Sequence, residues 1–282
     1  MTFKQILLVL DADEPAEAAS ETAATIAAGA GGVVEGVCVF REPAPSIADC
    51  YAVGPAAVGE VIEELRLEIR KSTAGVSEAF DRVIAGRGLS GGWRLTGIDD
   101  WRNALIGPAR IADLMVAPAA EAHHDFANAM VDLMLQSGAP CLIAPTRPSA
   151  QRPFHAPFRR VALAWNGSRE AARALREGMA FVEAASEVVV IVAAEEKTRW
   201  LDAANAERLI RRLALHGVEA ELVRVAETVE PVGDDLIAQC ETLQADLLVM
   251  GAYGRSRAAE MILGGATRTI LQQPPCAVLM SH

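Results

Sequence analysis

The stretch Asp246-Leu247-Leu248-Val249 repeats an earlier stretch, Asp113-Leu114-Met115-Val116, with one substitution. These two stretches lie 133 positions apart. Further along, Pro275-Cys276-Ala277-Val278 matches Pro140-Cys141-Leu142-Ile143 at a separation of 135 positions. A similarity that returns at nearly one spacing indicates an internal repeat, which has to be identified before any fold is assigned. The sequence therefore predicts two copies of one domain.

The length of the chain and its domain starts agree with this duplication. The chain has 282 residues, about the length of two ordinary domains. The start of the first copy, Ile6–Asp11, is similar to Val161–Asn166. Between the copies lies a proline-rich polar stretch, Pro145–Pro153, which is typical of a linker. We expect a first domain at 1–146, a linker at 147–157 and a second domain at 158–282.

Short apolar runs alternate with helical patterns in each half. In the second half these runs are Arg160–Trp165, Val188–Ala193, Ala220–Val225, Asp246–Met250 and Cys276–Met280. They are continuously apolar, as in strands that are covered on both faces. Between the first two runs, Ala171, Leu175, Met179 and Val182 recur at helical spacing. Alternating strands and helices predict an α/β fold in which each half is a doubly wound, five-stranded parallel sheet.

Composition excludes several classes of function. The net charge of −11 argues against nucleic acid as the main partner, because phosphate backbones select basic surfaces. No apolar stretch is long enough to span a membrane, and the N-terminus lacks the pattern of a signal peptide. We therefore expect a cytoplasmic protein. The five cysteines form no CxxC pair, and we expect ordinary buried thiols.

A glycine pattern follows the fourth strand of the second half. Gly251 and Gly254 are followed, after nine residues, by Gly264 and Gly265. Glycines at such places let a ligand approach the backbone, because they have no Cβ atom. Free N–H groups at the start of the following helix favour anionic oxygens, and Thr267 adds a hydroxyl donor. This pattern favours a polyphosphate ligand.

The pattern G-x-x-G-(nine residues)-G resembles the ATP-binding motif of the universal stress protein family, and Gly251, Gly254 and Gly264 match it one for one. The resemblance covers the whole chain as two tandem domains. It implies a strand order of 3-2-1-4-5, with ATP over the tips of the first and fourth strands. Two positions depart from the family pattern. Gly265 replaces a serine or threonine, and Asn166 replaces an acidic residue that would hold a divalent ion better.

The resemblance implies a set of ligand-binding residues in the second half. The phosphate group is expected at Gly251, Ala252, Gly254, Gly264, Gly265, Ala266 and Thr267. The base and ribose are expected at the strand ends marked by Ala164, Asn166 and Ala193. The expected cofactor is ATP, with AMP and ADP as alternatives and Mg²⁺ as an optional companion. No metal site and no catalytic residue are predicted in the protein itself.

The first half lacks this glycine pattern. Pro118, Glu121 and Val131 stand at the aligned places, where they remove a donor, add a carboxylate and add a branched side chain. We therefore expect one nucleotide per chain, held by the second half. The adjacent His123 and His124, with Asp125, lack the further ligand spacing of a metal site.

The function expected from this resemblance is a stress-response regulatory protein that binds an adenine nucleotide and is not an enzyme. Two alternatives stay open: a scaffold that binds no nucleotide and recruits protein partners, and a slow ATPase. The last strands of the two halves, at Ala139–Ala144 and Cys276–Met280, are apolar runs at a sheet edge, and such edges are usually paired or covered. The resemblance implies that these strands join the halves as an internal pseudo-dimer, with a homodimer as a further alternative. Gly86–Gly91 matches GxGxxG but follows a helical stretch, so it predicts a helix end.

Overall fold

The structure is a computed structural model of the chain. It describes residues 3–41, 54–119, 124–145, 157–193, 199–225, 232–252 and 265–282. The predicted linker lies almost wholly outside these residues, and the proposed domain boundaries stay predictions.

Strands and helices alternate along both halves, as the apolar runs predict. The elements of the first half are β1 (Gln5–Asp11), α1 (Glu17–Ala30), β2 (Val33–Phe40), α3 (Gly54–Gly86), β3 (Gly91–Gly97), a short 3₁₀ turn (Ile98–Asp100), α4 (Trp101–Ile111), β4 (Leu114–Pro118), α5 (His124–Ser137) and β5 (Cys141–Ala144). Those of the second half are β6 (Arg160–Ala164), α6 (Arg169–Ala184), β7 (Glu187–Ala193), α7 (Arg199–Leu215), β8 (Ala220–Val225), α8 (Val232–Leu243), β9 (Leu247–Gly251), α9 (Gly265–Gln272) and β10 (Ala277–Ser281).

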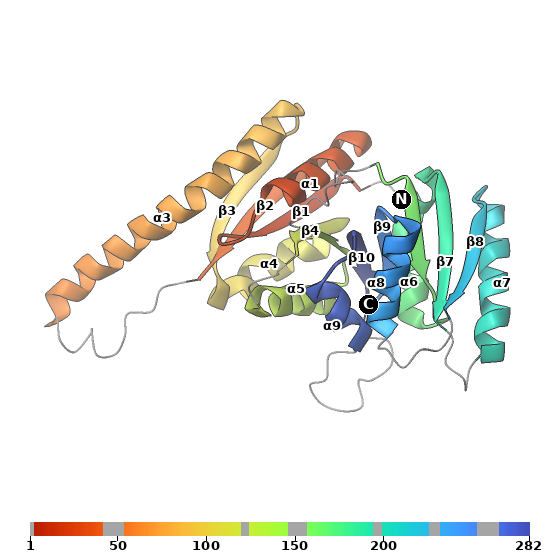
Figure 1. Cartoon of the computed structure of the whole chain (residues 1–282). Helices are drawn as coiled ribbons and strands as arrows, with labels where there is room; N and C mark the ends of the chain where they lie inside the picture. The colour runs from red at the N-terminus through yellow and green to blue at the C-terminus, as the bar shows by residue number, and fades with distance from the viewer. Residues whose placement is uncertain are drawn as a thin grey trace.

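All the described strands form one sheet, in the order β3-β2-β1-β4-β5-β10-β9-β6-β7-β8 (Figure 1). Each half therefore has the order 3-2-1-4-5, and its strands are parallel. The expected fold class is confirmed. The sheet order reverses between β1 and β4 in the first half and between β6 and β9 in the second half, and ligands of such sheets bind at this reversal.

The aspartate that opens each repeated stretch has the same structural task in both halves. One carboxylate oxygen of Asp113 accepts hydrogen bonds from the backbone N–H groups of Lys4 and Gln5, at 2.8 and 2.9 Å. Asp246 does the same for Arg159 and Arg160, at 3.0 and 2.9 Å. Each aspartate thus fixes the start of the first strand of its half against the start of the fourth. The repeat in the sequence records this anchoring contact.

Helices cover both faces of the sheet and divide the core into two layers. One buried cluster packs α1, α3, α6 and α7 against the first face, through residues such as Phe80 and Leu175. The other packs α4, α5, α8 and α9 against the second face, through residues such as Phe126 and Ile270. Both clusters contain residues from both halves of the chain. On each face of the sheet, the two repeats therefore share one layer of the hydrophobic core.

The last strands of the two halves pair with each other. β5 and β10 are antiparallel, with Ile143 opposite Val278, Leu142 opposite Leu279 and Cys141 opposite Met280. This confirms that the halves join through these two strands. The junction reverses the direction of the strands, so their carboxyl ends lie at opposite edges of the sheet in the two halves.

Side chains reinforce the junction on either side of this strand pair. The Arg173 guanidinium in α6 donates to the Gly138 carbonyl of the first half at 2.5 Å. The Phe3 ring stacks on the Phe181 ring of α6, with centroids 5.0 Å apart, and Phe158 meets the same ring edge-on. The halves are thus held together by hydrogen-bonded strands, an inter-half hydrogen bond and an aromatic cluster.

The two halves differ most in the helix after their second strand. α3 has 33 residues and α7 has 17, and Figure 1 shows the N-terminal part of α3 reaching well beyond the sheet. α3 ends at Gly86, Gly88 has a left-handed φ of 64°, and β3 starts at Gly91. The GxGxxG match is therefore a helix end, as predicted. None of the helices in the described part of the chain has the length and apolarity to cross a membrane.

Candidate nucleotide site

The predicted site lies where the second half reverses its strand order. β6 and β9 are direct neighbours, with Leu163 opposite Val249. The parallel pairing brings the residues that follow β6 to the same edge of the sheet as the end of β9. Ala164, at the end of β6, and Gly251, at the end of β9, therefore lie at this edge. It is the place where an open parallel sheet binds its ligands.

The turn after β6 presents an exposed amide. The Asn166 Oδ1 atom accepts a hydrogen bond from the Ser168 N–H at 3.1 Å, and Gly167 closes the turn with φ of 69°. Ser168 then caps α6 by accepting from the Ala171 N–H at 3.1 Å. Asn166 itself is exposed, and within the described part of the chain no acceptor is recorded for its Nδ2. This amide is free to donate to a ligand at the sheet edge.

Gly251 is required by the packing of α6. A Cβ atom at this position would lie 2.4 Å from the Ala171 nitrogen and 2.6 Å from the Glu170 carbonyl carbon. Both are backbone atoms at the start of α6, so neither can move aside as a flexible side chain would. The first motif glycine therefore has a structural reason to be glycine, whether or not a ligand approaches it.

The backbone of Ala252 is already engaged within the protein. Its N–H donates to the Ser281 carbonyl at 2.9 Å, and its carbonyl lies 3.0 Å from the His282 Nδ1. Ala252 is also fully buried. A ligand that bonded to either backbone group would have to displace one of these contacts.

The start of α9 is the more open part of the predicted phosphate site. Gly265 is exposed, and a Cβ atom there would meet nothing within 4 Å. Ala266 is half-buried and Thr267 is buried, at 4% exposure. The first N–H groups of a helix have no partner within the helix and carry its positive end, so this terminus suits an anion.

Several predicted residues fall outside what the structure describes. Gly254 and Gly264 belong to 253–264, which lies outside the described residues, so their part in the site stays a prediction. Ala193 ends β7, but its side chain lies outside the description. Within the described residues, no group of three or more His, Cys, Asp or Glu side chains could hold a metal ion.

Glu170 is a buried carboxylate at this edge that the sequence analysis missed. Burial raises its pKa, but a hydrogen bond from its own backbone N–H, an ion pair with Arg169 at 2.9 Å and the proximity of His282 lower it more. The net effect holds the pKa of the Glu170 carboxyl below its usual value. An acidic residue in the first turn after a serine cap was the available signal. This carboxylate adds negative charge close to Gly251.

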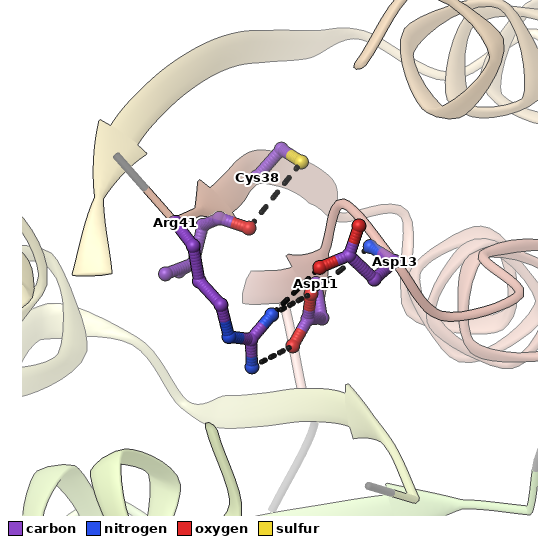
Figure 2. Close-up of polar contacts among 5 residues, drawn as sticks. Asp11, Asp13, Cys38 and Arg41 are labelled. Atoms are coloured by element: carbon purple, nitrogen blue, oxygen red, sulfur yellow. Dashed lines mark hydrogen bonds and ion pairs between the residues drawn. The ribbon is translucent and has the colours of Figure 1, made fainter. Parts of the chain in front are cut away.

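The first half closes the equivalent edge with an ion-pair cluster (Figure 2). Asp11 ends β1 and accepts from the Asp13 N–H at 3.0 Å, which is the same turn that Asn166 makes in the second half. Arg41 follows β2, and its guanidinium lies 3.3 Å from both Asp11 carboxylate oxygens and 2.8 Å from Asp13. The Asp11 side chain is 2% exposed and that of Arg41 is 31% exposed. Arg41 thus fills the edge where the second half presents a free amide.

The thiol of Cys38 lies beside this cluster and stays protonated. Burial, together with the negative charges of the nearby Asp11 and Asp13, raises the pKa of the Cys38 thiol to about 12. A thiol in this state is a poor nucleophile. The other described cysteines, Cys141, Cys240 and Cys276, are also buried, as expected for ordinary buried thiols.

The aligned loop of the first half is shorter than the sequence comparison assumed. Helix α5 begins at His124, so Val131 lies inside this helix and is buried instead of lying beside a ligand path. Pro118 ends β4 and is buried. Glu121 and His123 lie outside the described residues, as does the side chain of His124. The prediction that Val131 stands at the ligand-binding loop is therefore wrong, because a linear alignment does not show that this residue packs within a helix.

Comparison with known proteins identifies relatives of both the second half and the whole fold. Residues 157–282 match the model of the universal stress protein family. A universal stress protein from Archaeoglobus fulgidus DSM 4304 superposes with a TM-score of 0.67 at 17% identity, covering 98% of this chain and 97% of that one. A protein of unknown function from Pseudomonas aeruginosa PAO1 gives 0.59 at 15% identity, covering 99% and 92%. A search among curated proteins found no match. At these identities, the similarity establishes a shared fold.

Proposed function

We propose that the second half of this chain, whose residues 157–282 match the model of the universal stress protein family, binds an adenine nucleotide as a regulatory ligand. The nucleotide is ATP, or AMP or ADP in its place. The observation that carries the proposal is the position of the glycine pattern. Gly251 ends β9 beside β6, where the strand order reverses, and Gly265 begins α9.

Two features of this edge support the proposed division of the ligand. The exposed Asn166 amide suits the base or ribose, since it offers a neutral donor. The open start of α9 at Gly265 suits the phosphates, because its N–H groups and helix dipole favour negative charge. The proposal gives Mg²⁺ a minor part, because the neutral Asn166 is a weaker ligand for a divalent ion than a carboxylate.

A second candidate function is a scaffold that binds no nucleotide. Two observations favour it: both backbone groups of Ala252 are already bonded, and Glu170, whose Cβ lies beside Gly251, is acidic. In that case, Gly251 would serve only the packing of α6. The two functions differ in one measurable respect, which is whether the intact chain binds a nucleotide.

Calorimetric titration of the full chain with ATP, ADP and AMP, with and without Mg²⁺, tests the proposal. We expect saturable binding of one nucleotide per chain. Replacement of Gly254 by Val should weaken it by about 100-fold or more, because a branched side chain would occupy the space of the phosphates; that loss is nearly 3 kcal/mol. Gly29→Val in α1, where a Cβ atom meets nothing within 4 Å, is the matched control.

Mass spectrometry of small molecules released from the purified, denatured chain gives an independent readout. A released adenine nucleotide would support the proposal. Absence of binding in every titration would favour the scaffold. Equal affinities for wild type and Gly254→Val would remove the glycine loop from the mechanism, and two nucleotides per chain would show that the first half has kept a site.

A further inference from the structure

A cavity lies between α6 and α7 in the second half, on the face of the sheet opposite to α8 and α9. It has a volume of about 260 Å³. It is lined by Trp165, Ala172, Leu175, Arg176, Asn205, Arg208, Leu209 and Arg212. These residues belong to no sequence motif described above, and none of them is part of the proposed nucleotide site.

Helical spacing explains why these residues meet in one groove. Ala172, Leu175 and Arg176 are three and four positions apart, so they share one face of α6. Asn205, Arg208, Leu209 and Arg212 have the same spacing on α7. Trp165 joins them from the end of β6. The two helices therefore present a matched pair of faces to the cavity.

The cavity combines an apolar interior with a basic rim. Leu175 and Leu209 are buried, at 3% and 4% exposure, whereas Arg176 and Arg208 are exposed and Arg212 is half-buried. No acidic residue lines the cavity, although the chain has a net charge of −11. For Arg176, Arg208 and Arg212, no ion pair or hydrogen bond occurs among the residues that the structure describes. Guanidinium groups that have no partner within the described part of an acidic chain are suited to bind an external anion.

Trp165 contributes its ring to the cavity wall. Its Nε1 atom is shielded from water and has no hydrogen-bond partner among the described residues. An atom without accessible surface does not face the cavity, so this N–H is not offered to a ligand there. Trp165 therefore acts as an apolar part of the wall.

The cavity adjoins the proposed nucleotide site through Trp165, which lies between Ala164 and Asn166 in the chain, but it differs from that site in its position on the sheet and in its size. Leu175 and Leu209 belong to the core cluster on one face of the sheet, whereas Ala252 and Ile270 belong to the cluster on the other face. Ligand pockets for drug-sized molecules span about 300–1,000 Å³. The cavity falls just below this range, so its volume suits a ligand smaller than a nucleotide.

We propose that this cavity binds a small organic acid, with an aromatic or branched aliphatic body against Trp165, Leu175 and Leu209 and its anionic group held by Arg176, Arg208 and Arg212. The apolar walls select the body through burial of its surface. The planar guanidinium groups select a carboxylate or phosphate through paired, charge-assisted hydrogen bonds. The second half therefore carries two binding sites of different chemistry, one on each side of its sheet.

Titration of the full chain with phenylacetate tests this proposal, with phenylacetamide as a neutral probe of the same shape and inorganic phosphate as an anion without a body. Calorimetry and ligand-observed NMR provide the readouts. We expect phenylacetate to bind at least about ten-fold more tightly than either of the other probes, because only phenylacetate satisfies both the walls and the rim.

Variants then locate the binding within the chain. Arg176→Gln and the double variant Arg208→Gln/Arg212→Gln should each weaken phenylacetate binding by about ten-fold or more. Ala172→Phe should abolish binding by filling the cavity. Arg211→Gln is the matched control, because Arg211 is exposed on the same helix but does not line the cavity. Circular dichroism of each variant verifies that its fold is retained.

Three results would overturn the proposal. The first is the absence of saturable phenylacetate binding to the wild-type chain. The second is equal affinity for phenylacetate and phenylacetamide, which would remove the arginine rim from recognition. The third is a loss of phenylacetate affinity in Arg211→Gln as large as that in Arg176→Gln. Binding would then depend on the overall surface charge and not on the arginines that line the cavity.

Discussion

The two halves of this sheet share one scaffold but carry different side chains at the carboxyl ends of their strands. In the first half, Asp11 ends β1 buried against Arg41. In the second half, the equivalent Asn166 is exposed. The strands, their order and the anchoring aspartates Asp113 and Asp246 are the same. The scaffold is therefore held by backbone pairing, whereas the chemistry of each edge is set by a few side chains.

The largest predicted effect concerns the junction that makes the two halves one body. Cleavage of the chain at an engineered protease site within 147–157 should leave halves that co-elute from a sizing column, because β5 and β10 still pair. Leu142→Asp should separate the cleaved halves, since a carboxylate would be buried where the leucine is 0% exposed. Separation of the cleaved wild-type halves would contradict the shared core.

The next effect separates the two ends of the glycine pattern. Gly251→Ala should lower the free energy of unfolding by about 3 kcal/mol, at the upper end of the overpacking range, because the new Cβ atom meets backbone. Gly265→Ala should change it by less than about 0.5 kcal/mol, because the space there is open. Urea unfolding of both variants gives the comparison. Similar losses in the two variants would refute a packing role specific to Gly251.

A reciprocal exchange tests the difference between the two first-strand ends. Asp11→Asn should cost about 2 kcal/mol of unfolding free energy, because Arg41 loses a buried partner while keeping Asp13. Asn166→Asp should change stability by less than about 0.5 kcal/mol, since this residue is exposed. Thermal or urea unfolding measures both. Equal effects would mean that burial does not distinguish the two edges.

The smallest effect is a pH dependence at the edge of the second half. The folded pKa of Glu170 lies below its ordinary value of 4.5. Its ionised form therefore stabilises the fold above that value, and this contribution is lost as the pH falls through the lower, folded pKa. In Glu170→Gln, unfolding free energy should vary less with pH below about 4.5 than in wild type. Glu183→Gln, on the exposed face of the same helix, serves as the control.

The sequence predicted the sheet well because its signals are local and strong. The apolar runs at Ala220–Val225 and near Leu247–Gly251 appear as β8 and β9, and the family resemblance predicted that β5 and β10 would meet. A strand buried on both faces has few alternatives to a continuous apolar run. The strand order 3-2-1-4-5 was predicted from the family resemblance instead, and both halves have it.

The edge chemistry was harder to predict, because it depends on contacts between distant positions. Arg41 lies 30 positions from Asp11 and shares no motif with it, so their ion pair is visible only in three dimensions. Gly251 was assigned to a phosphate, yet its packing against Glu170 is invisible in a linear pattern. The linear alignment likewise did not show that α5 begins at His124. Val131, which was expected beside the ligand, therefore lies inside this helix.

The antiparallel pairing of β5 with β10 has a consequence for how this molecule can evolve. In a dimer of two identical chains, each substitution appears on both sides of the symmetry axis, and a change that helps one site is imposed on its twin. Here both sides of the pseudo-twofold axis are encoded separately in one chain. Arg41 can therefore pair with Asp11 at the edge of the first half without the same change being made in the second half. Because the two copies are joined in one chain, a substitution in one copy does not have to occur in the other.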